Sequence, residues 1–110
     1  MSIYVHEDDI TKTDENGHAG ADLIGADNGA TNGFSLGVAV YYLEAYVEPG
    51  VHDDQEGFYV VEGTGKARIG DEEFDIRPGS AFIAQKGVPH AMKKNPGSVP
   101  VRVVYGHGPV

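Results

Sequence analysis

Glycine- and proline-rich turns divide the second half of this chain into short segments at nearly regular intervals. The segments between these turns carry valine, isoleucine, phenylalanine or other apolar residues. The predicted strands are residues 56–62, 66–69, 73–76, 80–84, 90–93 and 101–105. Turns that recur every ~8–12 residues between short apolar segments are typical of antiparallel sandwiches and barrels. The spacing therefore predicts an all-β fold.

The longest apolar stretch, residues 34–47, precedes these segments. Both of its faces carry apolar side chains, which favours a strand that is covered on both sides. A helix is the rival interpretation, because periodicity alone cannot decide between the two for a short apolar run. The tyrosine and valine content and the closing Pro49-Gly50 turn favour the strand.

Residues 1–33 are polar and rich in aspartate, asparagine and glycine. Residues 3–5 could form a short strand, and residues 14–33 are predicted to be mostly loop. A chain of 110 residues is long enough for one modest core. The expected organisation is therefore one domain, with an N-terminal arm of residues 1–33 packed on a barrel of residues 34–110.

The composition excludes several classes of function. The formal net charge of −9 repels nucleic-acid phosphates and anionic lipid, so neither is an expected partner. The chain has no cysteine, which excludes disulfides, thiolate metal sites and cysteine nucleophiles. No apolar run approaches the ~20 residues of a membrane span, and the N-terminal residues do not resemble a secretory signal. We therefore expect a cytoplasmic protein whose metal ligands, if any, are histidine and carboxylate.

One histidine and one acid, His52 and Glu56, stand four residues apart after the Pro49-Gly50 turn. On a strand, residues separated by an even number point to the same face, so both side chains and Asp54 between them could face a barrel interior. An ionised glutamate there is costly without a cation or a hydrogen-bond donor. The spacing therefore indicates a metal site, and the alternative for each residue is a solvated loop side chain.

His90 is the second candidate position. It follows Gly87-Val88-Pro89, so the chain turns sharply and enters a strand at this histidine. Such a turn would fix the imidazole at a barrel mouth, where it could bind a metal ion.

The first of these stretches resembles the first motif of the cupin superfamily. His52, three residues, Glu56, six residues and Gly63 match the latter part of that motif, and the apolar run 58–61 before Glu62-Gly63 is its usual ending. The front of the motif is missing, because its first histidine falls on Gly50 and its opening glycine falls on Glu44.

The second stretch resembles the second cupin motif. Gly79, five residues, Gln85-Lys86-Gly87, two residues and His90 match it, with Gln85 in place of the usual proline. Lys94 stands where asparagine is expected. The resemblance covers roughly residues 36–105 and implies a double-stranded β-helix, that is, a jelly-roll barrel.

The resemblance also implies which residues hold a metal ion. It assigns His52, Glu56 and His90 to a divalent ion such as Zn, Fe, Mn or Ni. A replacement for the missing histidine could come from Asp54 or from His18. Otherwise His6, His18 and His107 are expected to be exposed, with His107 in a flexible tail. The tyrosines at 42, 46, 59 and 105 are expected to pack in the core or an interface, and the sequence does not choose which of them faces the pocket.

Three functions remain open at this point. The first is a metal-dependent enzyme of isomerase, lyase or dioxygenase type acting on a sugar or a keto-acid-like molecule. The second is a non-catalytic module that binds or senses a small ligand with weak or no metal. The third is a barrel filled by its own side chains. Proteins that look like this are commonly homodimers, so a homodimer is expected, paired through residues 34–47 or the N-terminal arm.

Overall fold

The computed structural model describes residues 2–15 and 17–110, and almost all of its regular structure is antiparallel β-sheet. The described strands are β1 (Thr13–Glu15), β2 (His18–Ile24), β3 (Ser35–Tyr41), β4 (Gln55–Glu62), β5 (Gly65–Ile69), β6 (Glu72–Ile76), β7 (Ala81–Ala84), β8 (His90–Lys94) and β9 (Val101–Gly108). Two single-turn 3-10 helices, η1 (Glu7–Asp9) and η2 (Ala26–Asn28), complete the regular structure of these residues. None of the described helices is long and apolar enough to cross a membrane.

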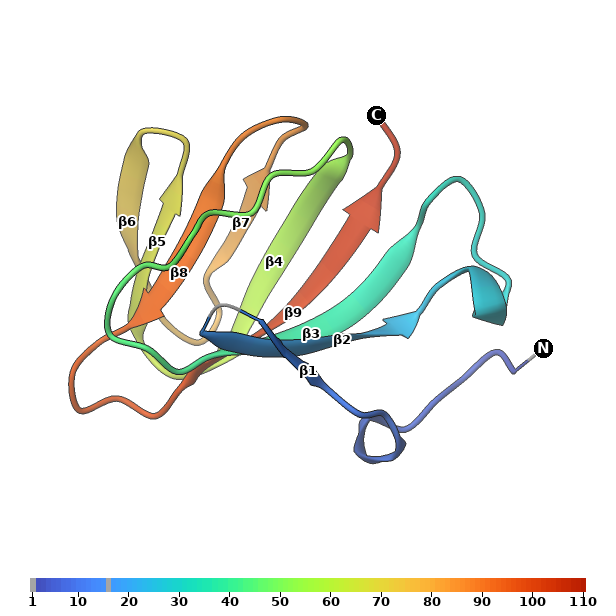
Figure 1. Cartoon of the computed structure of the whole chain (residues 1–110), viewed down its shortest axis with the longest axis horizontal. Helices are drawn as coiled ribbons and strands as arrows, with labels where there is room; N and C mark the ends of the chain where they lie inside the picture. The colour runs from blue at the N-terminus through green and yellow to red at the C-terminus, as the bar shows by residue number, and fades with distance from the viewer. Residues whose placement is uncertain (1, 16) are drawn as a thin grey trace.

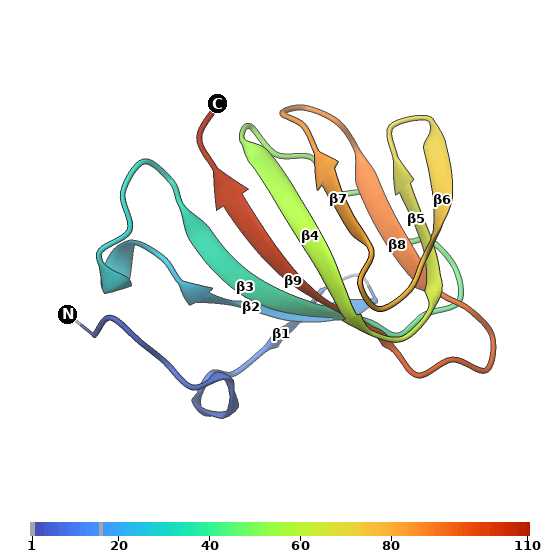
Figure 2. The ribbon, with the colours of Figure 1, turned by 180° about the vertical axis from the view of Figure 1, so that it is seen from behind.

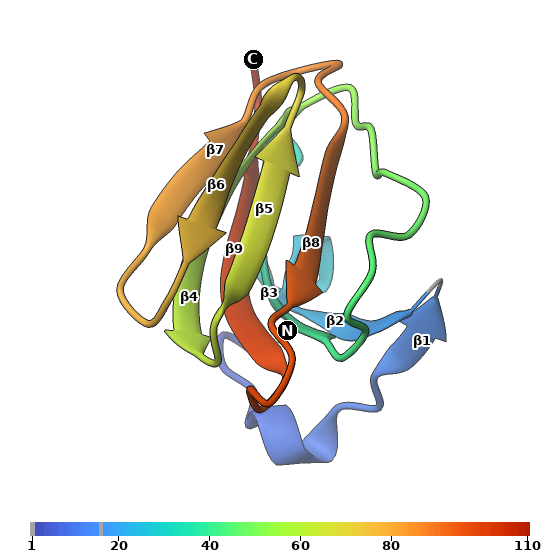
Figure 3. The ribbon, with the colours of Figure 1, turned by 90° about the vertical axis from the view of Figure 1, so that its left-hand side faces the viewer.

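The strands form two sheets that face each other. One sheet has six strands in the order β1-β2-β3-β9-β4-β7, and the other has three in the order β6-β5-β8 (Figure 1). Figure 2 shows the six-stranded sheet from behind, and Figure 3 shows the three-stranded sheet standing in front of it. This is a jelly-roll barrel, so the predicted all-β fold class is confirmed.

The core lies between the two sheets and follows the two-residue repeat of the strands. Phe58 and Val60 of β4 point into it, as do Val101 and Val103 of β9. Ala67, Ile76 and Met92 close it from the smaller sheet. Full burial of a side chain the size of valine or isoleucine stabilises the fold by about 1.5–3 kcal/mol. The alternation seen in the sequence is therefore the main source of the core.

The turns that punctuate the sequence are also where the backbone needs glycine. The turns that follow β4, β5, β6, β7 and β8 each contain a glycine with positive φ, namely Gly63, Gly70, Gly79, Gly87 and Gly97. L-residues rarely adopt that conformation. The regular spacing of glycines therefore marked true strand ends.

The prediction that residues 14–33 are mostly loop was wrong. This segment contains the end of β1, the whole of β2 and the helix η2, and β2 pairs with β3 from His18 opposite Tyr41 to Ile24 opposite Leu36. Glycine and aspartate in β2 have low β-propensity, but hydrogen bonds to β3 hold the segment in the sheet. Residues 3–5, by contrast, are not a strand.

The long strand predicted over residues 34–47 ends at Tyr41. Beyond it the chain leaves β3 and runs beside β8 of the other sheet. There the Lys94 amide donates to the Leu43 carbonyl at 2.9 Å, and Gly50 pairs with His90. The segment therefore closes the barrel instead of lengthening β3.

The last strand is longer than predicted, and this changes the position of His107. β9 continues to Gly108 because it pairs with β3 on one side and β4 on the other. His107 is thus a sheet residue opposite Ser35 and Glu56, and the predicted flexible tail was wrong at this position.

The N-terminal residues contact the barrel through more than one element. β1 and β2 belong to the six-stranded sheet, and Glu7 of η1 forms ion pairs with Lys12 and with Arg102 of β9. These two cations lower the pKa of Glu7, the hydrogen bond from Arg102 being the largest cause. We keep the division into residues 1–33 and 34–110 as a proposal about domain organisation.

Candidate metal centre

A cavity of about 630 Å³ opens between the two sheets. Residues of β2, β3, β4, β8 and β9 line it, together with the segment from Val47 to Gly50. The three residues predicted as metal ligands, His52, Glu56 and His90, all reach this one cavity.

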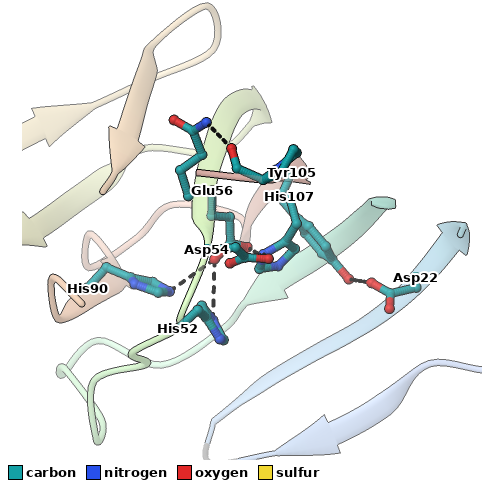
Figure 4. Close-up of polar contacts among 9 residues, drawn as sticks. Asp22, His52, Asp54, Glu56, His90, Tyr105 and His107 are labelled. Carbon is teal, nitrogen blue, oxygen red and sulfur yellow. Dashed lines mark hydrogen bonds and ion pairs between the residues drawn. The ribbon is translucent and has the colours of Figure 1, made fainter. Parts of the chain in front are cut away.

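These three side chains converge although they come from two sheets. Glu56 is the second residue of β4, His90 is the first residue of β8, and His52 precedes β4. His52 Nε2 lies 3.4 Å and His90 Nε2 lies 3.2 Å from the same oxygen, Glu56 Oε1 (Figure 4). One donor atom from each residue lies within 4.8 Å of the others.

Burial makes this cluster chemically unusual. The side chains of Glu56 and His90 are 8% and 7% exposed, whereas that of His52 is 44% exposed and faces the cavity mouth. Glu56 Oε1 is buried and has no hydrogen-bond partner among the described residues, despite the two imidazoles beside it. A buried carboxylate oxygen without a donor is costly, and a cation removes that cost. Two imidazole nitrogens and one carboxylate oxygen are ligands suited to a divalent transition metal, so the residues present fit such an ion.

Gly50 lies directly against this cluster. Its amide and carbonyl form two hydrogen bonds of 2.9 Å with the backbone of His90. A Cβ atom at position 50 would lie 3.0 Å from His90 Nε2 and 3.7 Å from His52 Nε2. The position that lacks the expected histidine is therefore occupied on its inner side by the imidazole of His90.

His107, which was predicted to lie in an exposed flexible tail, also reaches the cluster. Its Nε2 lies 3.2 Å from Glu56 Oε2, the second oxygen of the same carboxylate. Its ring centroid lies 5.0 Å from that of His52. A signal for this was present, because Val101, Val103 and Tyr105 are odd-numbered like His107 and lie on one face of β9. Ending the predicted strand at residue 105 hid it.

Asp54 faces His107 and is not one of the three converging residues. Its two carboxylate oxygens lie 3.0 and 3.1 Å from His107 Nδ1. Asp54 was expected to face the barrel interior because residues 52, 54 and 56 would lie on one face of a strand. However, β4 begins at Gln55, so residues 52–54 do not alternate as strand residues do.

His18 lies on β2 and lines the cavity, so it is not the exposed side chain that was expected. Its ring stacks on Tyr41 with centroids 4.9 Å apart, and its Nδ1 is buried without a hydrogen-bond partner among the described residues. Burial lowers the pKa of His18, which favours the neutral imidazole. His6, by contrast, is exposed as predicted.

The structure shows which of the four tyrosines faces the cavity, a question that the sequence left open. Tyr105 lines the cavity and donates to Asp22 Oδ1 at 2.6 Å (Figure 4). Burial and this hydrogen bond raise the pKa of Tyr105, so its hydroxyl keeps its proton. Tyr42 and Tyr46 instead bond to Asp14 and Glu73 outside the cavity. Tyr105 therefore supplies a neutral hydroxyl to the cavity wall.

Comparison with known proteins points to one family. The family model described as a cupin domain matches residues 42–106. No curated protein sequence matches the chain. Among solved structures, the polyketide cyclase RemF from Streptomyces resistomycificus is similar with a TM-score of 0.77 and 24% identity, over 94% of this chain and 76% of that one.

Two further solved structures have the same fold. Ectoine synthase from P. lautus gives a TM-score of 0.79 at 19% identity, over 96% of this chain and 76% of that one. An RmlC-like cupin from Shewanella frigidimarina gives 0.77 at 15% identity, over 97% and 90%. At these identities the similarity concerns the fold and leaves the chemistry of the cavity open.

Proposed function

This chain belongs to the cupin domain family, and on that premise we propose that it is a metal-dependent enzyme acting on a small oxygen-bearing molecule in the central cavity. The metal ion is divalent, one of Zn, Fe, Mn or Ni, and its ligands are His52, Glu56 and His90. One observation carries the proposal: two imidazole nitrogens converge on Glu56 Oε1, a buried oxygen that has no hydrogen-bond partner among the described residues.

The side chains around the cavity have different proposed roles. The bound ion would supply Lewis-acid chemistry, or activation of water or dioxygen, to a coordinated oxygen. Glu56 and His90 are buried and hold their positions, whereas His52 is the ligand nearest to solvent. Tyr105 keeps its proton and can turn its hydroxyl toward an oxygen of the bound molecule. A sugar or a keto acid has oxygens that suit both the ion and this hydroxyl, and an isomerase, lyase or dioxygenase reaction is the proposed class.

The alternative is a non-catalytic module that binds or senses a small ligand. The observation that favours it is Gly50, which removes one histidine of the usual set from the cluster. The enzyme is preferred because His52, His90 and the buried oxygen Glu56 Oε1 still form a set of donor atoms that suits a metal ion without a histidine at position 50.

Metal content and turnover test the function together. Protein purified without chelators should contain about one transition-metal ion per chain, and His52→Ala and His90→Ala should lose it. The metal-loaded protein should then turn over at least one member of a panel of sugars and keto acids. Absence of metal even after soaking in Zn²⁺ or Mn²⁺ would refute the proposal. Stoichiometric metal with ligand binding but no turnover would identify the binding module instead.

A homodimer is the proposed assembly, and exposed apolar residues support an interface on the outer face of the six-stranded sheet in place of the expected one at residues 34–47 or the N-terminal arm. Tyr59, Val61 and Ile83 on β4 and β7 are 51%, 40% and 50% exposed there, and they suit a second copy of the chain. Light scattering after gel filtration should give twice the chain mass, and Tyr59→Glu with Ile83→Glu should give one chain mass. A wild-type monomer at micromolar concentration would contradict this. A cytoplasmic location is likewise only proposed.

A further inference from the structure

We propose that His107, near the end of β9, is a fourth ligand of the metal ion and that Asp54 positions it. This inference rests on the proposed function, because it concerns the same ion. In this proposal, His107 of β9 replaces the first motif histidine, whose position is occupied by Gly50.

Strand pairing brings His107 to the cluster. Glu56 of β4 and His107 of β9 are direct partners across the antiparallel pair. Residues directly opposite each other in such a pair project their side chains to the same face, with Cβ atoms about 4.5–5.5 Å apart. The contact between His107 Nε2 and Glu56 Oε2 therefore follows from the register of the sheet and does not depend on a mobile tail.

Three imidazoles surround the carboxylate of Glu56. His52 and His90 approach Oε1 of Glu56, while His107 approaches Oε2 at 3.2 Å (Figure 4). The ring of His52 lies near both of the others, with centroid distances of 5.1 Å to His90 and 5.0 Å to His107. The donor atoms of His52, Glu56 and His90 lie within 4.8 Å of one another, and His107 contacts the second oxygen of the same carboxylate.

Asp54 determines which nitrogen of His107 is free. Both oxygens of Asp54 lie within hydrogen-bond distance of His107 Nδ1, so the Nδ1–H donates to this carboxylate. The neutral ring then carries its lone pair on Nε2, which points at Glu56 Oε2. Two acceptors 3.2 Å apart repel unless a cation or a proton lies between them. A carboxylate that holds the far nitrogen of a metal-ligating histidine is the usual arrangement around metal sites.

Position 50 is crowded by the imidazole of His90. A Cβ atom there would lie 3.0 Å from His90 Nε2, so a side chain at this position requires the His90 ring to shift. His107 enters from β9, on the opposite strand, and needs no such space.

Metal affinity tests this inference directly. Competition with a chromophoric chelator for Zn²⁺ should show that His107→Ala weakens binding by more than about 100-fold, because loss of an outer-shell partner alone costs 10–100-fold. Asp54→Asn keeps the shape of the side chain and should weaken binding by about 10–100-fold. The control is His6→Ala. His6 is exposed and distant in sequence from the cluster, so this variant should bind Zn²⁺ like the wild type.

Nitrogen-15 spectra of the histidine rings in the wild-type protein provide a readout that needs no substitution. On addition of Zn²⁺, the Nε2 resonances of His52, His90 and His107 should all shift to the position of a metal-bound nitrogen. If only His52 and His90 shift, and His107→Ala binds Zn²⁺ like the wild type, His107 is a protonated bridge between Asp54 and Glu56 and the inference is overturned. If no histidine shifts and wild-type protein takes up no metal, the proposed function fails as well.

Discussion

Glu56→Ala is expected to abolish the thermal stabilisation that Zn²⁺ gives to the wild-type protein. Glu56 is the residue that every imidazole of the cluster faces, and it contributes the only carboxylate among the three converging residues. A ligand present at 100 times its dissociation constant stabilises the folded state by about 2.7 kcal/mol. For a domain of this size that corresponds to a rise in melting temperature of about 10–20 °C. The wild type should show this rise and the variant should show none.

The matched control for this experiment is Glu62→Ala. Glu62 is exposed at the end of the same strand, and its removal changes the net charge by the same amount. It should keep the full response to Zn²⁺, which separates loss of a ligand from loss of general attraction between an acidic surface and a cation. A normal Zn²⁺ response in Glu56→Ala would mean that the ion binds elsewhere on the chain.

Gly63→Ala is expected to destabilise the fold by about 2–5 kcal/mol, which is a large part of the 5–15 kcal/mol of a typical domain. Gly63 has φ of 84°, where an L-residue costs about 1–2 kcal/mol. In addition, a Cβ atom would lie 2.4 Å from the carbonyl oxygen of Pro100 and 2.9 Å from the Cα atom of Val101. Backbone atoms cannot move away cheaply, so overpacking adds about 1–3 kcal/mol. Urea unfolding followed by circular dichroism measures the difference.

Gly79→Ala separates the two contributions. Gly79 has φ of 95°, but apart from its own and its two neighbouring residues no described residue has an atom within 4 Å of the position that a Cβ would take. Gly79→Ala should therefore lower the free energy of unfolding only by the cost of an L-residue at positive φ, about 1–2 kcal/mol. If Gly63→Ala and Gly79→Ala are destabilised equally, the contact of the new Cβ atom with Pro100 does not contribute to the loss of stability.

The sequence alone predicted the cupin barrel and the three converging residues, and the physical reasons are local. Positive φ at a turn favours glycine, and side-chain alternation follows from the pleat of a strand. Motif comparison can recognise Gly63 and Gly79 because they stand at turns with positive φ. A search for alternating apolar residues can recognise Val101 and Val103 because they lie on one face of a strand. His52, Glu56 and His90 were found because each has a fixed distance in sequence from such a turn.

Other features depended on pairing between distant segments. β2 carries glycine and aspartate and reads as a loop, but hydrogen bonds to β3 make it part of the sheet. The family match ends at residue 106, one residue before His107, so motif comparison had no means of reporting this side chain.

What the sequence determined by itself is the barrel, its turns and a histidine–glutamate–histidine set with a glycine at the place of the first motif histidine. What only the tertiary structure decided is the environment of that set. The register between β4 and β9 places His107 opposite Glu56, and the backbone bridge between Gly50 and His90 brings the His90 imidazole against position 50. Register is a property of two strands that lie about 50 residues apart, set by all their hydrogen bonds and buried side chains together, and no short stretch of sequence encodes it.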